Sequence, residues 1–397
     1  MRSSYRSILC VAALLVPQVA LAHHGPGSFE LAKTIELSGK LTRIDLVNPH
    51  SWLYFENTGS DGKVSRFRCE MRSLHVLRRS GWSADMFRLG QQIKITASPD
   101  RKDPNSCYLQ TIIFENGTRM DRYGQYVKAD AGAVKEIRGP LAAPDTSKRP
   151  LRRSTGEPNI SGDWAAEQTV NADPRGVGGR MMPLSRINEY KPGEQPAARG
   201  AAGRAGRGAA IGPRLFGGTE LTEAGNQKAD ADRASLANGP RPTCQPTSII
   251  FDWTFDGPVN RITQNKDSIV IQYGQFNVKR TVFMNLKAHP ASIKPSRAGH
   301  SIGRWEGDTL VVDTVGFEPG SINRGVPHSD KLHIVERFAL DSQAMRLTRA
   351  WEADDVQYLK GTAKGQDAVY PAETKYTEDR CNDQTALDYS KVGQAKK

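Results

Sequence analysis

Long apolar runs are what this chain has least of. Its 397 residues are 38% hydrophobic and 25% charged, and no stretch reaches the 18 apolar residues that indicate a transmembrane helix. This pattern excludes a membrane bundle, and the length is sufficient for two or three folded domains. The 37 Gly and 23 Pro argue against a largely helical protein, because in a helix interior Gly costs about 1 kcal/mol and Pro about 3 kcal/mol. The composition therefore predicts an all-β protein with long loops.

The first 22 residues have the pattern of a secretory signal peptide. Arg2 and Arg6 precede an apolar run at 8–16, which is too short to span a bilayer, and Ala20-Leu21-Ala22 matches a cleavage site. We expect cleavage after Ala22, a mature chain that starts at His23, and a periplasmic or secreted protein. Cys10 lies within the apolar run and lacks the sequence setting of a lipid-modified cysteine.

Cysteine is scarce, with five residues in the whole chain. No C-x-x-C pair or Cys/His spacing indicates a zinc site. In an oxidising compartment the four cysteines outside the leader allow three pairings. We favour Cys69–Cys107 and Cys244–Cys381, because each pair then lies within one proposed domain; free buried thiols are the alternative.

The formal net charge of +12 first suggests a nucleic-acid partner. Export makes that partner improbable. Much of the basic excess falls in a proposed linker at 121–157 and in a low-complexity Arg/Gly loop at about 172–218, which cannot form a core. We therefore expect no nucleic-acid partner and no transmembrane segment, and the basic linker suggests contact with the anionic cell envelope.

The region 23–120 is predicted to be a five-stranded barrel of the OB type. A helix is expected at 73–80, capped by Ser73 and stopped by Gly81. Three strands before it and two after it give the order of an OB-fold. Alternating apolar residues place the strands at 34–47, 52–55, 64–71, 92–97 and 108–114.

The region 158–385 is predicted to be an antiparallel barrel of the calycin or lipocalin type, followed by a tail at 386–397. A helix at 222–236, capped by Thr222, precedes it, and Gly162-Asp163-Trp164 could supply its first strand. Helical crossovers are almost absent, which excludes a parallel sheet. Short strand-like runs lie at 249–255, 268–273, 279–284, 309–314, 332–338, 345–351 and 356–361.

Two resemblances support this division into domains. The N-terminal half, with His23-His24, the turn Asn48-Pro49-His50 and the run at 77–82, resembles a family of small uncharacterised bacterial periplasmic proteins. The C-terminal half, through the run GHSIGRWEGDTLVVDT at 299–314, is similar to a set of uncharacterised exported bacterial β proteins. Both resemblances imply exported β domains, and neither implies an activity.

Two charged residues share the apolar face of their strands. Glu336 has the parity of Leu332, Ile334 and Phe338, and Arg349 has that of Leu347. A buried carboxylate is costly unless it is paired, so we expect Glu336 to meet a cation such as Arg349 inside the barrel or near its mouth. The pair could orient a polar ligand or brace the strands.

The function that we expect is a non-catalytic binding module for a small apolar or amphipathic ligand in the C-terminal barrel. Such barrels enclose a cavity, although this is an analogy at the level of the fold. The candidate ligand-binding residues are Glu336, Arg349, Trp305 and Trp351. In the enzyme alternative, Glu336 and a nearby histidine act as acid and base, which requires that Glu336 face accessible space instead of Arg349.

A third hypothesis is copper binding at the mature N-terminus. The α-amine and the imidazole of His23 would form a bidentate nitrogen chelate that suits Cu(II), with a third nitrogen from His24 or His50. A solvated N-terminal tail is the alternative.

Three other patterns carry less weight. Gly299-His300-Ser301-Ile302-Gly303 matches a serine-hydrolase elbow, but a β-branched strand follows it where the elbow requires a helix. The residues His300, His328 and His333 lie in one barrel segment without the spacing of a helix-borne metal site. The aromatic residues of the OB-like groove, Trp52, Tyr54 and Phe67, suit either oligosaccharide binding or a core.

Overall fold

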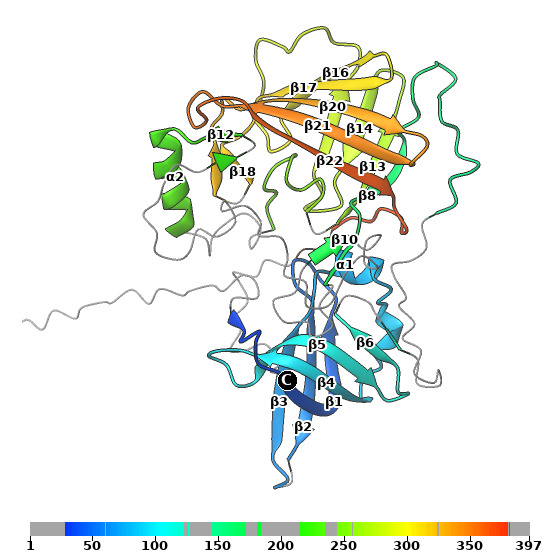
Figure 1. Cartoon of the computed structure of the whole chain (residues 1–397), viewed down its shortest axis with the longest axis vertical. Helices are drawn as coiled ribbons and strands as arrows, with labels where there is room; N and C mark the ends of the chain where they lie inside the picture. The colour runs from blue at the N-terminus through cyan, green and yellow to red at the C-terminus, as the bar shows by residue number, and fades with distance from the viewer. Residues whose placement is uncertain are drawn as a thin grey trace, which may run out of the picture.

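Two β-barrels, one after the other along the chain, make up almost all of the regular structure of the computed structural model (Figure 1). The signal peptide, His23, His24, the C-terminal tail and most of the Arg/Gly loop lie outside the described residues, so the structure does not test those predictions. The structure describes residues 28–59, 61–122, 126–127, 144–171, 181–183, 215–216, 218–234, 244–255, 257–323, 325–379 and 381.

The N-terminal barrel has the predicted order of three strands, a helix and two strands. The parallel pairing of β3 with β5 closes it, and Cys69 lies opposite Cys107 across that joint. Helix α1 (Leu74–Arg79) begins as predicted at Ser73, whose side chain accepts a hydrogen bond from Val76 N. A 3-10 turn, η2 (Ala84–Met86), follows it. The strands are β1 (Ile35–Asp45), β2 (Trp52–Thr58), β3 (Val64–Glu70), β4 (Gln92–Pro99) and β5 (Ser106–Phe114), with β6 (Arg119–Asp121) and β7 (Tyr126–Val127) added at the edge of β5.

The C-terminal barrel is closed by nine strands. The predicted first strand is confirmed, because β8 pairs with both β13 and β22 and so closes the ring. In barrel order the strands are β13 (Val259–Gln264), β14 (Ser268–Gln272), β15 (Lys279–Phe283), β16 (His300–Glu306), β17 (Thr309–Val315), β20 (His333–Asp341), β21 (Arg346–Asp354), β22 (Ala363–Pro371) and β8 (Gly162–Ala165).

One joint of this barrel differs from the antiparallel expectation. Strands β15 and β16 run parallel and pair over two positions, Val282 with Ser301 and Phe283 with Ile302. The connection 284–299 makes this possible, because it carries the chain back along the barrel without a helix. Turn patterns in the sequence do not reveal such a crossover.

Two of the strands predicted for this barrel are wrong, and three strands of the barrel ring were missed. Residues 249–255 form turns, since the carboxylate of Asp252 accepts hydrogen bonds from Thr247 N and Ser248 N and curls the chain. Residues 356–361 are a turn, a bridge and bends around Asp355, which accepts from Gln357 N and Tyr358 N. The missed strands are β13, β16 and β22.

The remaining short elements surround the C-terminal barrel. The predicted helix at 222–236 is confirmed as α2 (Glu223–Ala234), and Thr222 caps it by accepting a hydrogen bond from Gly225 N at 3.0 Å. The short strands are β9 (Thr169–Asn171), β10 (Met181–Pro183), β11 (Leu215–Phe216), β12 (Thr219–Glu220), β18 (Gly320–Asn323) and β19 (Val326–His328).

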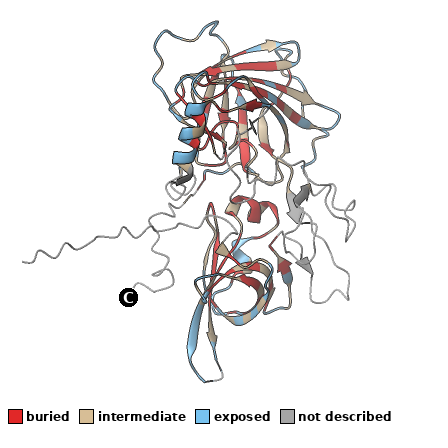
Figure 2. Ribbon diagram, turned by 60° about the vertical axis from the view of Figure 1, so that its left-hand side comes forward, coloured by how far each residue is buried: buried red, intermediate tan, exposed pale blue. Residues whose placement is uncertain are grey.

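Each barrel has its own hydrophobic core, which Figure 2 shows as buried residues lining the two interiors. Both predicted disulfides are present, Cys69–Cys107 and Cys244–Cys381, so the alternative of free thiols is wrong. Disulfides of this kind fit an oxidising compartment. In the described part of the chain, no helix is long and apolar enough to cross a membrane.

Basic residues of the proposed linker bind the C-terminal barrel. Arg149 donates to Asn159 O and Ser161 O and lies over the ring of Trp164, and Arg152 forms an ion pair with Asp308. These arginines therefore have partners within the protein, which leaves less of the linker charge for an envelope contact.

The two barrels meet at α1 and the turn before β2. Asn48 Nδ2 donates to Asp379 Oδ1 at 2.6 Å, and His75 Nε2 lies 3.6 Å from the same oxygen. Burial opposes the charge on Asp379, but the hydrogen bonds from His75 and its other donors outweigh it and lower the pKa of that carboxyl. Arg79, 3% exposed, donates to both carboxylate oxygens of Glu373 and to Gly257 O.

Replacing Arg79 should weaken this junction. Arg79→Met leaves Glu373 and Gly257 O without their donor, and we expect the free energy of unfolding to fall by about 3 kcal/mol, the usual cost of removing one partner of a buried ion pair. Arg78→Met is the matched control, because Arg78 makes an exposed hydrogen bond to Thr377. Urea unfolding followed by circular dichroism measures both, and equal losses would contradict the assignment.

Candidate functional site

Glu336 and Arg349 meet inside the C-terminal barrel, as their parity predicted. Arg349 Nη1 lies 3.1 Å from Glu336 Oε1, and both side chains are 0% exposed. They come from neighbouring strands, β20 and β21, whose inward faces also carry Ile334, Phe338 and Leu347. The pair lies in the interior of the barrel and not at its rim.

A second arginine, which the sequence analysis missed, contacts the same carboxylate. Arg280 Nη2 lies 2.5 Å from Glu336 Oε2, and this side chain is also 0% exposed. Arg280 Nε donates to Ser301 Oγ at 2.8 Å and Nη2 to Thr314 Oγ1 at 2.6 Å. The sequence pattern could have indicated this residue, because Arg280 is two positions from Val282 and lies on the same buried face of β15.

A second carboxylate brings the centre to neutrality. Asp367 on β22 accepts from Arg349 Nε at 3.0 Å and from Arg349 Nη2 at 2.5 Å. Burial opposes the charges on Arg280 and Arg349, but Glu336 for the first and Asp367 for the second outweigh it, so the pKa of each guanidinium is raised. Both guanidinium groups are thus charged at physiological pH.

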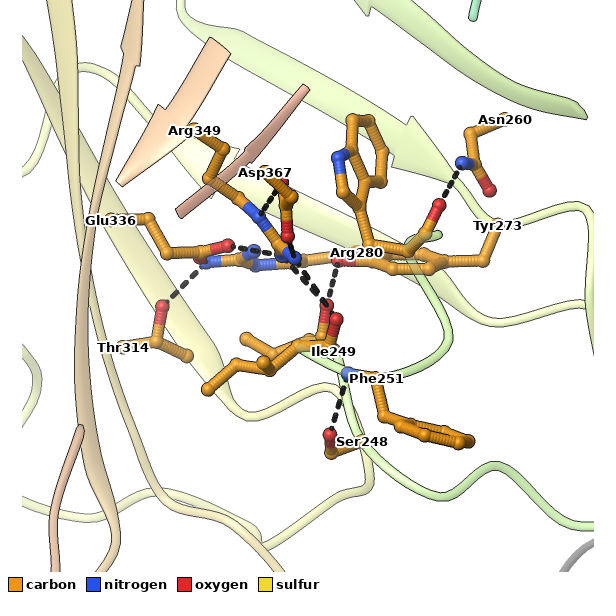
Figure 3. Close-up of polar contacts among 12 residues, drawn as sticks. Ser248, Ile249, Phe251, Asn260, Tyr273, Arg280, Thr314, Glu336, Arg349 and Asp367 are labelled. Atoms are coloured by element: carbon orange, nitrogen blue, oxygen red, sulfur yellow. Dashed lines mark hydrogen bonds and ion pairs between the residues drawn. The ribbon is translucent and has the colours of Figure 1, made fainter. Parts of the chain in front are cut away.

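The charged centre also holds a segment of the chain inside the barrel (Figure 3). We call residues 247–255 the inner segment. Arg349 donates to the backbone carbonyls of Ile249 at 3.0 Å and Ile250 at 2.9 Å. Tyr273, whose pKa is raised to about 12 by burial, donates to Ile249 O. Ser248 Oγ anchors one end of the segment by donating to Ile322 O at 2.7 Å.

Trp253 is the apolar contact of the inner segment with the barrel wall. Its ring meets those of Tyr273 and Phe338 edge-on, with centroids 5.7 and 6.0 Å away, and Arg349 lies 5.5 Å above it. Three buried polar atoms here, Thr247 Oγ1, Trp253 Nε1 and Arg280 Nη1, have no hydrogen-bond partner within the described structure. Such groups normally bind water or a ligand.

The two tryptophans predicted to bind ligand pack in the core of the barrel. Trp351 is 8% exposed and lies against Gly365, where any side chain would collide with the indole ring. Trp305 is partly buried against the same core. They belong to the barrel of Glu336 and Arg349, and Trp351 lies opposite Glu336 in the register of β20 and β21.

The copper hypothesis stays a prediction. His23 and His24 lie outside the described residues. His50, the proposed third ligand, has its Nδ1 2.6 Å from Glu70 Oε1. Among the described residues no group of three His, Cys, Asp or Glu side chains is arranged to hold a metal ion.

Two of the three barrel histidines lie in one cluster on the outer wall. His333 Nε2 is 3.1 Å from Asp313 Oδ1, His289 Nε2 is 3.0 Å from the same oxygen, and His289 Nδ1 is 2.8 Å from His300 Nδ1. We call these four residues the histidine cluster. His328 is elsewhere and buried, with its Nδ1 donating to Ser329 O.

The geometry does not favour the two catalytic alternatives. Glu336 is enclosed between Arg280 and Arg349 and does not face accessible space. Ser301 is buried on β16, which begins at His300, and its hydroxyl is bonded to Arg280 and Thr314. No helix follows β16, since the chain turns into β17.

The aromatic residues of the OB-like barrel are covered. Phe67 stacks on Phe55 in the core. Trp52 and Tyr54 are 8% and 5% exposed, and the guanidinium groups of Arg68 and Arg43 lie over their rings at 5.6 and 5.1 Å. They offer no open stacking surface for a sugar.

Comparison with known proteins adds a family for the N-terminal part. Residues 11–107 match the Family of unknown function (DUF6152). That range holds the turn Asn48-Pro49-His50 and most of the first barrel, in agreement with the resemblance to an uncharacterised family. No curated protein matches the chain.

The charged centre predicts a large loss of stability when its shared carboxylate is removed. Glu336→Gln leaves two buried guanidinium groups with one remaining carboxylate, and we expect a loss of about 3 to 5 kcal/mol. Arg337→Gln is the matched control, because its exposed side chain on the same strand should change stability by less than about 0.5 kcal/mol. Similar unfolding midpoints for the two variants in guanidinium chloride would refute a central role for Glu336.

Proposed function

We propose that this is an exported, non-catalytic binding protein, and that its C-terminal barrel takes a small amphipathic ligand. The observation that carries the proposal is that Arg349 donates to two peptide carbonyls of the inner segment within a closed barrel. A carboxylate, ester or carbonyl oxygen of a ligand presents the same acceptor. The buried donors Arg280 Nη1 and Trp253 Nε1 would satisfy a further acceptor.

The apolar part of such a ligand has a defined surface to contact. Tyr273 and Phe338 of the wall form an aromatic group with Trp253 of the inner segment, and each is 2% exposed or less. An aliphatic chain or a ring would exchange its contact with water for contact with these rings, a gain of roughly 25 cal/mol for each Å² of apolar surface buried.

The inner segment lies where the ligand would bind and so controls its entry. Because it occupies the interior in this structure, a ligand has to displace part of it, and the segment acts as a competitor. Its release at this end requires that the hydrogen bond from Ser248 Oγ to Ile322 O, in the connection 316–332, be broken. That connection and 284–299 lie at the same end of the barrel, since β17 ends and β16 and β20 begin there.

The proposed location rests on two kinds of residue. The predicted signal peptide at 1–22 directs export, and the two disulfides fit an oxidising compartment. A barrel that binds small molecules is then a periplasmic or secreted carrier or sensor.

A dansylated fatty acid is a suitable probe for this barrel. We expect saturable one-to-one binding with a micromolar dissociation constant, measured by energy transfer from the buried tryptophans. Ser248→Ala should tighten binding severalfold, because it removes the Ile322 anchor and leaves Arg349 intact. Ser268→Ala, at a surface hairpin, should leave the affinity unchanged.

Two outcomes would overturn the proposal. One is the absence of saturable binding to the folded mature chain. The other is binding that Ser248→Ala and Ser268→Ala affect equally. Native mass spectrometry of protein purified from the periplasm provides an independent check, since a retained small molecule should appear as a discrete mass increment.

A further inference from the structure

Beyond Met284, which packs on the barrel core, the first half of the connection 284–299 is held to the barrel by one side chain in the described structure. Residues 285–292 are exposed with the single exception of His289. Its ring bridges two strands, because Nδ1 meets His300 on β16 and Nε2 meets Asp313 on β17. The second half of the connection is tied separately, by Ser296 to the backbone of Gly316 and Glu318 and by the Arg297–Glu318 ion pair.

His289 thus ties the chain that leaves β15 to β16 and β17, beside one of the least paired joints of the barrel. Strands β15 and β16 share two paired positions, whereas β16 and β17 share seven. The joint between β22 and β8 also has two pairs, but there Ala372 N donates to Asp163 O and continues the ladder. At the β15–β16 joint, Arg280 contacts Ser301 from inside and His289 contacts His300 from outside.

We propose that the histidine cluster is a proton-operated latch that opens this end of the barrel on acidification. The inference rests on the proposed function in that it assigns a control to the same binding site. A hydrogen bond between two imidazole Nδ1 atoms requires that one of them lack a proton. When both rings are protonated, two donors and two positive charges face each other at 2.8 Å and the contact is lost.

The neighbouring charges favour release of His289 over release of His333. The groups that face the His289–His300 contact are Asp313 on β17, His333 on β20 and Asp354, which lies opposite His333 on β21. From β15, the ring of Phe283 stacks on His300 and carries no charge. Asp313 Oδ1 serves both His289 and His333, so a protonated His333 competes for the oxygen that orients His289.

The directions in which the pKa values of His300 and His333 are shifted set the pH range over which the latch opens. Burial first, and then His289, lower the pKa of His300 below its usual 6.5. The stability that this neutral ring contributes is present above pH 6.5 and is lost as the pH falls through the lowered value. The hydrogen bond to Asp313 raises the pKa of His333, so the stability of the His333–Asp313 pair is lost only as the pH rises through that raised value and is fully present below pH 6.5. Acid therefore breaks the His289 contact and keeps the His333 contact.

Hydrogen exchange measured by mass spectrometry on the mature chain tests the latch without any ligand. With labelling times corrected for the intrinsic pH dependence of exchange, protection of the Met284 amide, which donates to Asp267 O at the start of the connection, should fall at least tenfold between about pH 7.5 and about pH 5. His289→Ala should show the low protection at both pH values. His333→Gln should move the loss of protection to lower pH, because Asp313 then serves His289 alone.

His50→Ala is the matched control, since His50 pairs with Glu70 in the other barrel and should keep the wild-type pH profile at the Met284 amide. Unchanged protection across the pH range, or a wild-type profile in His289→Ala, would overturn the latch. The dansylated fatty acid separates the two proposals. Opening at low pH without probe binding at any pH refutes the binding function alone, and probe binding with pH-independent protection refutes the latch alone.

Discussion

The carboxylate of Glu336 lies between two guanidinium groups in the interior of a β-barrel, and the organisation of the C-terminal domain depends on that contact. Each buried ion loses hydration worth several kcal/mol, so the array persists only because every charge has a close opposite charge. Arg280 reaches Glu336 from β15, Arg349 from β21, and Asp367 neutralises the second arginine from β22. Four strands of the ring, β15, β20, β21 and β22, are thereby joined across the interior and not only along their edges.

The same charged centre also fixes the position of the inner segment. Arg349 has more donors than Glu336 and Asp367 use, and the remaining bonds go to the carbonyls of Ile249 and Ile250. A barrel lined by apolar residues alone would have no means of fixing an irregular segment, whose peptide groups would be left unsatisfied. The charged centre therefore explains why the interior holds a folded-back stretch of chain, and why ligand binding involves competition with that stretch.

Much of this fold follows from the sequence, and the exceptions have physical causes. Alternating apolar residues identified the N-terminal barrel, and parity placed Glu336 and Arg349 inside. Residues 249–255 were wrongly predicted to be a strand. Ile249, Ile250 and Trp253 are all buried, but in a turn, and a short apolar run does not distinguish a buried turn from a strand. Asp313 and His289 are 24 residues apart, and only the parallel crossover at 284–299 brings them together.

The turn Asn48-Pro49-His50 makes a contact between the two barrels that the sequence did not predict. Asn48 is 1% exposed and donates to Asp379, a residue of the segment that follows the second barrel. In this chain the family-matched N-terminal domain uses the turn, together with Arg79, to bind the C-terminal domain. Its role here is to join two barrels, a role that the family description, which names no function, does not include.

The most direct test of this account is hydrogen exchange within the inner segment of an Arg349→Met variant. The amides of Phe251, Asp252 and Phe255 are bonded within the segment, to Ser248 Oγ, Ser248 O and Phe251 O. If Arg349 holds the segment in the barrel, their protection should collapse while that of β13 and β14 persists. Unchanged protection of these three amides in a folded variant would contradict the claim that the charged centre organises the domain.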